Sequence, residues 1–143
     1  MRILALDPGK TTGVCLAING RIEETRETPT TTGGEFHELL HVMEYWWKPD
    51  LVICEQFLHR TTIGVDTTAL EVIGCVKMFV WLQSPMELVF QTPSMAKAFW
   101  TDDKLKAVGL WRKGQRHAMD ATRHALAYLM KSDDRYIRSL SPQ

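Results

Sequence analysis

The sequence is poor in cysteine and contains no long hydrophobic segment. The three cysteines are Cys15, Cys54 and Cys75. They lie far apart in apolar surroundings, without a CxxC pair or the Cys/His spacing of a zinc site, so we expect reduced core residues and an intracellular protein. The longest apolar run, 72–82, is shorter than the roughly 18 residues of a membrane span and contains Lys77. A secretory signal is not expected either, because the apolar opening reaches Asp7 too early.

The chain also lacks internal repeats, linkers and low-complexity tracts. Its 143 residues are 45% hydrophobic and 24% charged, which is typical of one compact domain. A domain of this length buries about two-thirds of the surface of its unfolded chain, so it needs no disulfide or structural metal to fold. We predict a single domain over residues 1–131, followed by a polar tail over 132–143.

No excess of either charge appears in the whole chain, because 17 basic and 17 acidic residues cancel. The charges are unevenly placed, however. Residues 1–96 hold 7 Lys and Arg against 12 Asp and Glu, whereas residues 97–143 hold 10 against 5. The basic C-terminal third is compatible with a phosphate backbone as partner, and equally with an ordinary solvated helix face.

The first third of the sequence predicts three antiparallel strands joined by short turns. Residues 1–7 are apolar on both alternating faces, as in a central strand. A second apolar run follows at 14–18, and Asn19-Gly20 is a strong signal for a two-residue hairpin. In 21–28 apolar and charged residues alternate, which is typical of an edge strand.

Two crossover units are expected next. Thr32-Gly-Gly-Glu35 predicts the start of a helix that ends before Pro49. The later strands are expected at 50–57 and 86–91. The later helices are expected at 67–82, at 94–100 with Ser94 as its cap, and at 115–131. A further short helix is expected to begin at Asp102 or Asp103. This order predicts an α/β fold with a five-stranded mixed sheet, three antiparallel strands and then two parallel crossover strands, flanked by helices.

Three carboxylates lie in surroundings that are unusual for a charge. Asp7 ends an apolar strand, Glu55 follows a Leu-Val-Ile-Cys run, and Asp120 lies in an Ala- and Met-rich helix. A buried charge costs several kcal/mol unless it is paired or binds a cation. If the two strands are parallel neighbours, both acids lie toward one sheet edge, and the last helix can add Asp120 together with His117, three residues earlier.

Such a cluster of carboxylates without a thiolate suits Mg²⁺ or a similar hard cation. Two such ions can activate a water and stabilise a leaving oxygen in phosphodiester hydrolysis. Simpler interpretations stay open for each residue alone. Asp120 can pair with Arg116 or Arg123, and His117 can be a surface histidine. For His124 we expect a role in packing or in a polar network.

Three stretches of the sequence resemble a known family. They are Ile3–Gly13 (ILALDPGKTTG), Val52–Gln56 (VICEQ) and His117–Ala121 (HAMDA). Together they resemble the RuvC family of Holliday junction resolvases, within the ribonuclease H-like superfamily, and the order of elements agrees over about 130 residues. The resemblance implies a ribonuclease H-like fold and an endonuclease that acts in DNA recombination and repair.

The resemblance also implies the catalytic and metal-binding residues, which are Asp7, Glu55, His117 and Asp120. The cofactor would be Mg²⁺ or Mn²⁺, with a two-ion site. The partner would be four-way or other branched DNA, cut by a homodimer. The DNA-binding residues would be Phe57, Arg60, Lys97 and Lys104.

Two segments, 58–66 and 104–116, match the family only loosely. Such divergence would suit a phage-encoded member with a broader range of branched DNA substrates, working in the cytoplasm of a bacterium or of a phage-infected host cell. For the subunit contact the sequence offers the apolar helix at 67–82, which could equally be buried against the sheet.

Other functions remain open at this point. A nucleotide-binding actin-like or sugar-kinase-like domain also opens with a strand, an Asp-x-Gly turn and a hairpin, but such proteins enclose the nucleotide between two domains and this chain supplies one. An RNA-processing nuclease or a non-catalytic nucleic-acid-binding module on the same fold is the principal alternative.

Overall fold

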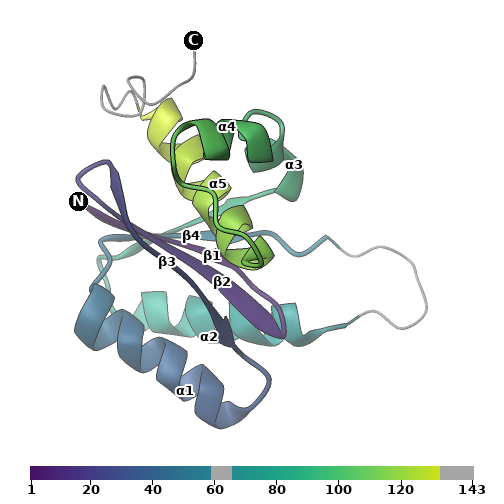
Figure 1. Cartoon of the computed structure of the whole chain (residues 1–143). Helices are drawn as coiled ribbons and strands as arrows, with labels where there is room; N and C mark the ends of the chain where they lie inside the picture. Colours follow the sequence, from purple (N-terminus) through teal and green to yellow (C-terminus); the bar gives the residue numbers. More distant parts are fainter. Residues whose placement is uncertain (59–65, 133–143) are drawn as a thin grey trace.

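The computed structural model describes residues 1–58 and 66–132 and contains a five-stranded mixed sheet (Figure 1). The strands are β1 (Arg2–Asp7), β2 (Thr11–Ile18), β3 (Arg21–Pro29), β4 (Leu51–Glu55) and β5 (Glu87–Gln91). Their order in the sheet is β3-β2-β1-β4-β5. The pairs β1/β2 and β2/β3 are antiparallel, and β1/β4 and β4/β5 are parallel. The predicted α/β fold class and mixed sheet are confirmed.

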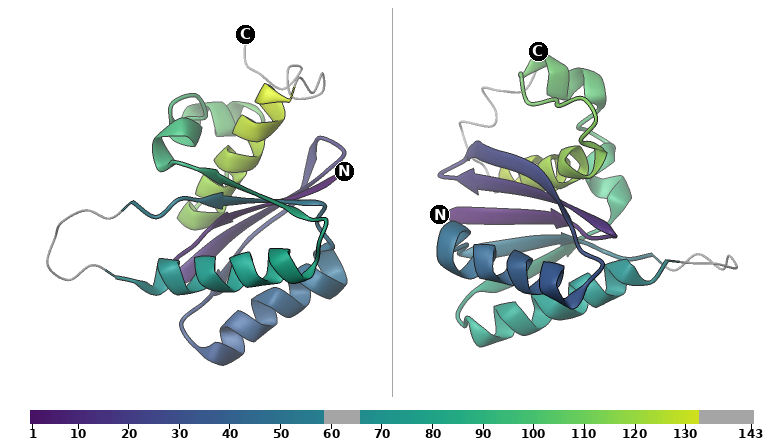
Figure 2. Two further views of the ribbon diagram at one scale, coloured as in Figure 1. Left: turned by 180° about the vertical axis from the view of Figure 1, so that it is seen from behind. Right: turned by 60° about the horizontal axis from the view of Figure 1, so that its bottom comes forward.

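Helices cover both faces of this sheet. They are α1 (Gly33–Val42), the π-helical turn η1 (Met43–Trp47), α2 (Thr68–Leu82), α3 (Pro93–Lys97), α4 (Asp102–Ala107) and α5 (Arg116–Lys131). In Figures 1 and 2, α1 and α2 lie below the sheet, and α3, α4 and α5 lie above it. Among the helices, α5 has the most extensive packing against the strands, and it crosses β1, β2 and β3.

The central strand β1 contributes to a separate core on each face. Ile3 and Ala5 pack on the side of α5, and Leu4 and Leu6 pack on the side of α1 and α2. All four side chains are at most 1% exposed. Their alternation explains why this strand is apolar throughout, because a central strand between two helical layers has no solvated face.

The predicted start of α1 is confirmed by its cap. The Thr32 hydroxyl accepts a hydrogen bond from the Glu35 amide, and the Glu35 carboxylate accepts one from the Thr32 amide. The helix continues into η1 and ends at Lys48, which has a φ of 44° in the left-handed region. Pro49 follows, so the predicted stop is also in place.

Some predicted boundaries are wrong. The strand β2 begins at Thr11 and not at Val14, because the turn after Asp7 is tighter than expected. The helix α3 is preceded by Thr92 and begins at Pro93, whose fixed φ and missing amide hydrogen suit a first helical position, so Ser94 lies inside it and does not cap it. It also ends at Lys97 and not at Trp100, since the chain then turns to bury the Trp100 side chain.

The predicted polar tail lies outside the described residues from position 133 onward. Within the described part of the chain, no helix has the length and apolar character needed to cross a membrane. The cysteines are unpaired, with Cys15 and Cys54 buried and Cys75 partly buried, and burial raises the pKa of both buried thiols to about 12. Cys15 and Cys54 are therefore neutral core residues, as predicted for these two.

Candidate metal-binding site at the carboxyl edge of the sheet

The two strand-end carboxylates lie side by side. Asp7 ends β1 and Glu55 ends β4, and the parallel register pairs Leu6 with Cys54 immediately before them. The carboxyl ends of parallel neighbours meet at one sheet edge. Asp7 is only 6% exposed, and the Glu55 side chain is 17% exposed. The expectation that both acids share an edge is therefore confirmed.

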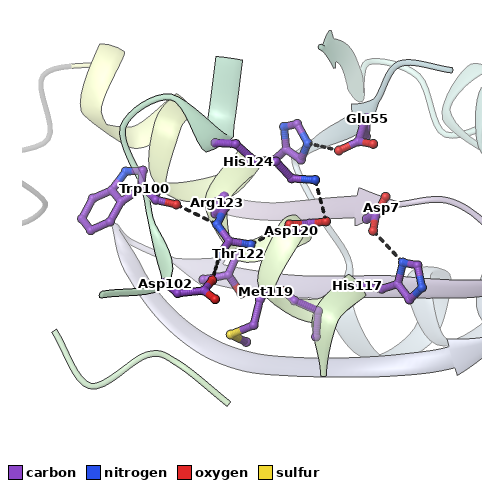
Figure 3. A network of polar contacts seen from close by, with 12 residues as sticks. Asp7, Glu55, Trp100, Asp102, His117, Met119, Asp120, Thr122, Arg123 and His124 are labelled. Carbon is purple, nitrogen blue, oxygen red and sulfur yellow. Dashed lines mark hydrogen bonds and ion pairs between the residues drawn. The ribbon is translucent and has the colours of Figure 1, made fainter. Parts of the chain in front are cut away.

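The N-terminal half of α5 adds two more predicted residues to this edge. The His117 Nδ1 atom lies 2.9 Å from Asp7 Oδ2, and Asp120, one turn further along α5, is 6% exposed (Figure 3). The structure thus brings Asp7, Glu55, His117 and Asp120 to one place from three separate elements, as the resemblance implied.

The start of α5 is held by a strand on the far side of β2. Gln115 provides no side-chain cap, and the Glu27 carboxylate of β3 accepts hydrogen bonds from the backbone amides of His117 at 2.8 Å and Ala118 at 3.4 Å. An anion at this position also interacts favourably with the helix dipole. The close approach is possible because β2 has Gly13 at the crossing point. A Cβ atom there would lie 1.9 Å from the His117 carbonyl oxygen.

The electrostatics of Asp7 show that the carboxylates share one field. The pKa of the Asp7 carboxyl is raised to about 6, first by burial and then by the negative charges of Glu55 and Asp120, against a lowering by the His117 hydrogen bond. The three carboxylates are therefore close enough to repel one another, and a bound cation would relieve that repulsion.

Each of the other two carboxylates has its own partner. Glu55 Oε2 lies 2.7 Å from His124 Nε2 (Figure 3). The Oδ1 atom of Asp120 accepts a hydrogen bond from the Arg123 guanidinium at 2.6 Å. The Oδ2 atom of Asp120 lies 3.0 Å from Lys97 Nζ. Sequence analysis left open whether Asp120 pairs with Arg123, and it does. The expected polar-network role of His124 is also found.

The donor set fits a hard divalent cation in its chemistry. Carboxylate oxygens are the preferred ligands of Mg²⁺ and Mn²⁺, and an imidazole is tolerated by Mn²⁺. Among the described residues no group of three acidic, histidine or cysteine side chains converges into a closed metal cluster, since each carboxylate is turned toward its own partner. Among the described residues, hydrogen bonds to Asp7 and Glu55 reach only Asp7 Oδ2 and Glu55 Oε2.

The predicted DNA-binding residues lie in different surroundings. Lys97 on α3 lies among the carboxylates through its contact with Asp120, although its side chain is 45% exposed. The Lys104 ammonium lies 3.5 Å from the centre of the Phe99 ring. Phe57, just beyond β4, is partly buried against the core on the α2 side. Arg60 lies outside the described residues.

Sequence reasoning found only part of the network that supports the site, since it named Arg123 and His124 but missed Gln91 and the contacts of Arg123 beyond Asp120. Arg123 is 6% exposed and donates to the Trp100 carbonyl oxygen at 2.7 Å, and it also pairs with Asp102 (Figure 3). Gln91 at the end of β5 is 4% exposed and contacts His124. The available signal was an arginine and a histidine three and four residues after Asp120 on a buried helix.

Comparisons with known proteins identify the fold. No protein-family model matches the sequence, and no curated protein matches it significantly. Among solved structures, RuvC of Thermus thermophilus in complex with a Holliday junction substrate is 18% identical, with a TM-score of 0.70 over 94% of this chain and 97% of that chain. The chain thus has the ribonuclease H-like fold of RuvC.

Two further resolvase structures share this fold. The yeast mitochondrial Holliday junction resolvase Ydc2 is 13% identical, with a TM-score of 0.68 over 96% of this chain and 83% of that chain. The fowlpox virus Holliday junction resolvase is also 13% identical, with a TM-score of 0.58 over 92% of this chain and 99% of that chain. The resemblance seen in the sequence is thus confirmed at the level of the fold.

Proposed function

We propose that this chain is a metal-dependent, structure-selective DNA endonuclease that resolves four-way junctions and acts on other branched DNA. The observation that carries the proposal is the meeting of Asp7, Glu55, His117 and Asp120 at one sheet edge, in a fold shared with Holliday junction resolvases. Fold likeness alone does not assign an activity. The site supports the proposal independently, because carboxylates are the ligands of the divalent ions that assist phosphodiester hydrolysis.

The proposed roles follow from the contacts of each residue. Asp7, Glu55 and Asp120 would hold Mg²⁺ or Mn²⁺, with His117 beside Asp7 as a further ligand or as the base that orients water. Bound divalent ions would supply Lewis acidity, which activates a water and stabilises the leaving oxygen. Lys97, at the edge of the same group, would contact a backbone phosphate and bring the scissile strand to the carboxylates.

The test is cleavage of a labelled four-way junction, a replication-fork analogue and a linear duplex, each with Mg²⁺, Mn²⁺ or EDTA. We expect metal-dependent cuts in the branched substrates and none in the duplex. Paired symmetric cuts in the junction alone would indicate a dimeric resolvase, and cuts in every branched form a broader nuclease. Binding without cutting would support a non-catalytic module, and preferred cutting of structured RNA an RNA-processing nuclease.

The two lysines provide a test of DNA contact. Lys97→Ala and Lys104→Ala are each expected to weaken junction binding and to lower the slope of log affinity against log salt by about one unit, because each removes one phosphate contact. Binding titrations at several salt concentrations measure the slope. Lys131→Ala, in the last turn of α5, is the matched control and should leave the slope unchanged. An unchanged slope in the first two variants would mean that these lysines do not contact DNA.

For the homodimer we propose a contact through the outer face of α2. Its inner face packs on the sheet with Val72, Val76 and Phe79. The large apolar side chains exposed on this helix are Leu70, Met78, Trp81 and Leu82, which are 46%, 59%, 75% and 65% exposed. The helix is therefore buried against the sheet on one face, which was the second of the two alternatives from the sequence, and has exposed apolar side chains on the other. A four-way junction has two equivalent strands to be cut, which a symmetric pair of active sites can reach. A second copy of this chain is therefore the partner that we propose for the exposed apolar side chains of α2.

Trp81→Glu is expected to convert the dimer to a monomer, because a charge would be buried at the centre of the contact. Sedimentation velocity at micromolar concentration measures the change. In a supercoiled cruciform plasmid the variant should give nicked circles in place of linear product. Met95→Glu on α3, where the side chain is 43% exposed on the opposite face of the sheet, is the control and should remain dimeric. A dimeric Trp81→Glu variant would place the contact elsewhere.

A further inference from the structure

A buried histidine spans the ends of two neighbouring strands beside the candidate metal site. His124 on α5 is 0% exposed, and its Nε2 atom lies 2.7 Å from Glu55 Oε2 (Figure 3). Its Nδ1 atom lies 2.8 Å from Gln91 Oε1. Both ring nitrogens are therefore in hydrogen bonds with side chains at the carboxyl edge of the sheet.

This contact is built from three elements that fix one another. The parallel register pairs Glu55 at the end of β4 with Gln91 at the end of β5, and the Gln56 amide donates to the Gln91 carbonyl oxygen at 2.8 Å. The helix α5 then places the imidazole across both side chains. A planar ring with a partner at each nitrogen cannot rotate without losing one of the two hydrogen bonds.

The imidazole determines where the Glu55 carboxylate lies. A glutamate has three side-chain torsions, and the 17% exposed side chain of Glu55 has no cationic partner among the described residues comparable to the Arg123 and Lys97 pair at Asp120. His124 occupies only the Oε2 atom, which leaves Oε1 available to a ligand. The same contact therefore restrains the side chain and keeps one oxygen available.

Packing alone does not account for a histidine at this position. The neighbouring buried positions on this helix, Ala121 and Ala125, are apolar and belong to the core. An apolar side chain at 124 would leave the buried Gln91 amide and Glu55 Oε2 without a partner, which costs free energy. The requirement for a polar ring comes from the strand ends and not from the helix.

We propose that His124 and Gln91 are positioning residues that hold Glu55 in the orientation needed to bind the divalent metal. The proposal rests on the proposed function, in which Glu55 is a metal ligand. Hydrogen-bonding partners of metal ligands orient them, and loss of such a partner lowers metal affinity by about 10- to 100-fold. Neither residue need contact the metal or DNA for this effect.

The experiment measures Mn²⁺ binding directly, without DNA, from the electron paramagnetic resonance signal of free Mn²⁺. His124→Phe, which keeps a planar ring but no hydrogen bond, is expected to weaken Mn²⁺ binding about 10- to 100-fold. His124→Gln should recover most of the affinity, because its amide nitrogen can donate from the position of Nε2. Cleavage by His124→Phe should return to within a few-fold of the wild-type rate once Mn²⁺ is raised to saturation.

Controls separate positioning from folding. Thr122→Val changes a fully buried neighbour whose hydroxyl donates to the Ala118 carbonyl oxygen at 2.7 Å and also contacts the Cys15 thiol, away from Glu55, and should bind Mn²⁺ normally. Gln91→Leu disturbs the ring from its other side and is expected to weaken binding by a smaller factor. It tests the proposal even if His124→Phe does not fold.

Each outcome separates the two proposals. If Glu55→Gln abolishes Mn²⁺ binding while folded His124→Phe and Gln91→Leu bind as the wild type does, the positioning role is wrong and the proposed function stands. If His124→Gln binds no better than His124→Phe, the hydrogen bond is not the cause and the positioning role is again wrong. If Glu55→Gln binds Mn²⁺ with wild-type affinity, Glu55 is not a ligand and the proposed metal site itself fails.

Discussion

Asp7→Asn is expected to abolish junction cleavage and to leave junction binding intact. The side chain is 6% exposed, lies at the end of the central strand, and interacts with Glu55, Asp120 and His117. Asparagine has nearly the same shape but no charge, so the fold and the DNA-binding surface should survive. Loss of the anionic metal ligand that we propose for Asp7 would remove several kcal/mol of transition-state stabilisation, which corresponds to about 10³-fold or more in rate.

Single-turnover cleavage of a four-way junction in Mn²⁺ measures this loss, and a mobility-shift titration in EDTA measures binding. Asp103→Asn is the matched control, because this α4 side chain is 94% exposed and pairs only with Lys106 among the described residues. It should cleave as the wild type does. Cleavage by Asp7→Asn at a similar rate would remove the assignment of the whole site.

The same substitution should make the protein more stable above pH 6. The folded state raises the pKa of Asp7 from 3.8 to about 6, mainly through burial, so between these values the folded chain holds a proton that the unfolded chain has released. The free energy of unfolding therefore falls as the pH rises from about 4 to 6, by up to about 3 kcal/mol from this group. Asparagine removes that penalty. Urea unfolding in EDTA would show the full gain at pH 7.5, about half of it at pH 5, and almost none at pH 3.5.

The outline of the candidate site could be predicted because its signals are local. A carboxylate directly after an apolar strand is conspicuous in the sequence, and this placed Asp7 and Glu55 at strand ends. Parallel pairing then brought the two together by topology alone. Asp120 and His117 followed from helical spacing, because residues three apart share one helix face.

The partners of these residues could not be predicted, because they depend on where α5 crosses the sheet. His124 and Glu55 are 69 residues apart, and Glu27 and His117 are 90 apart. No periodicity links such positions. Lys97 is a further example. Sequence analysis predicted that Lys97 contacts DNA, but it did not predict the ion pair with Asp120, which depends on where α5 crosses the sheet.

That crossing is the basis of a prediction for a second variant, that Gly13→Ala will impair both folding and cleavage. Gly13 does not have a positive φ, so the glycine is required by space and not by backbone conformation. An added Cβ would lie 1.9 Å from the His117 carbonyl oxygen and 2.6 Å from the Ala118 amide nitrogen. Both are backbone atoms that no rotamer change can move, so the first turn of α5 must shift.

A shift of the first turn of α5 by about 1 Å would move His117 away from Asp7 and can cost about 10²-fold in rate. Overpacking of this kind also destabilises by about 1–3 kcal/mol. Gly34→Ala on α1 is the matched control, since a Cβ there meets only Thr32 Oγ1, at 3.9 Å, and alanine favours a helix. Thermal unfolding and single-turnover cleavage should therefore separate the two glycine variants. Equal stability and equal cleavage in both would mean that α5 does not approach β2 this closely, and the placement of His117 and Asp120 at the sheet edge would then be wrong.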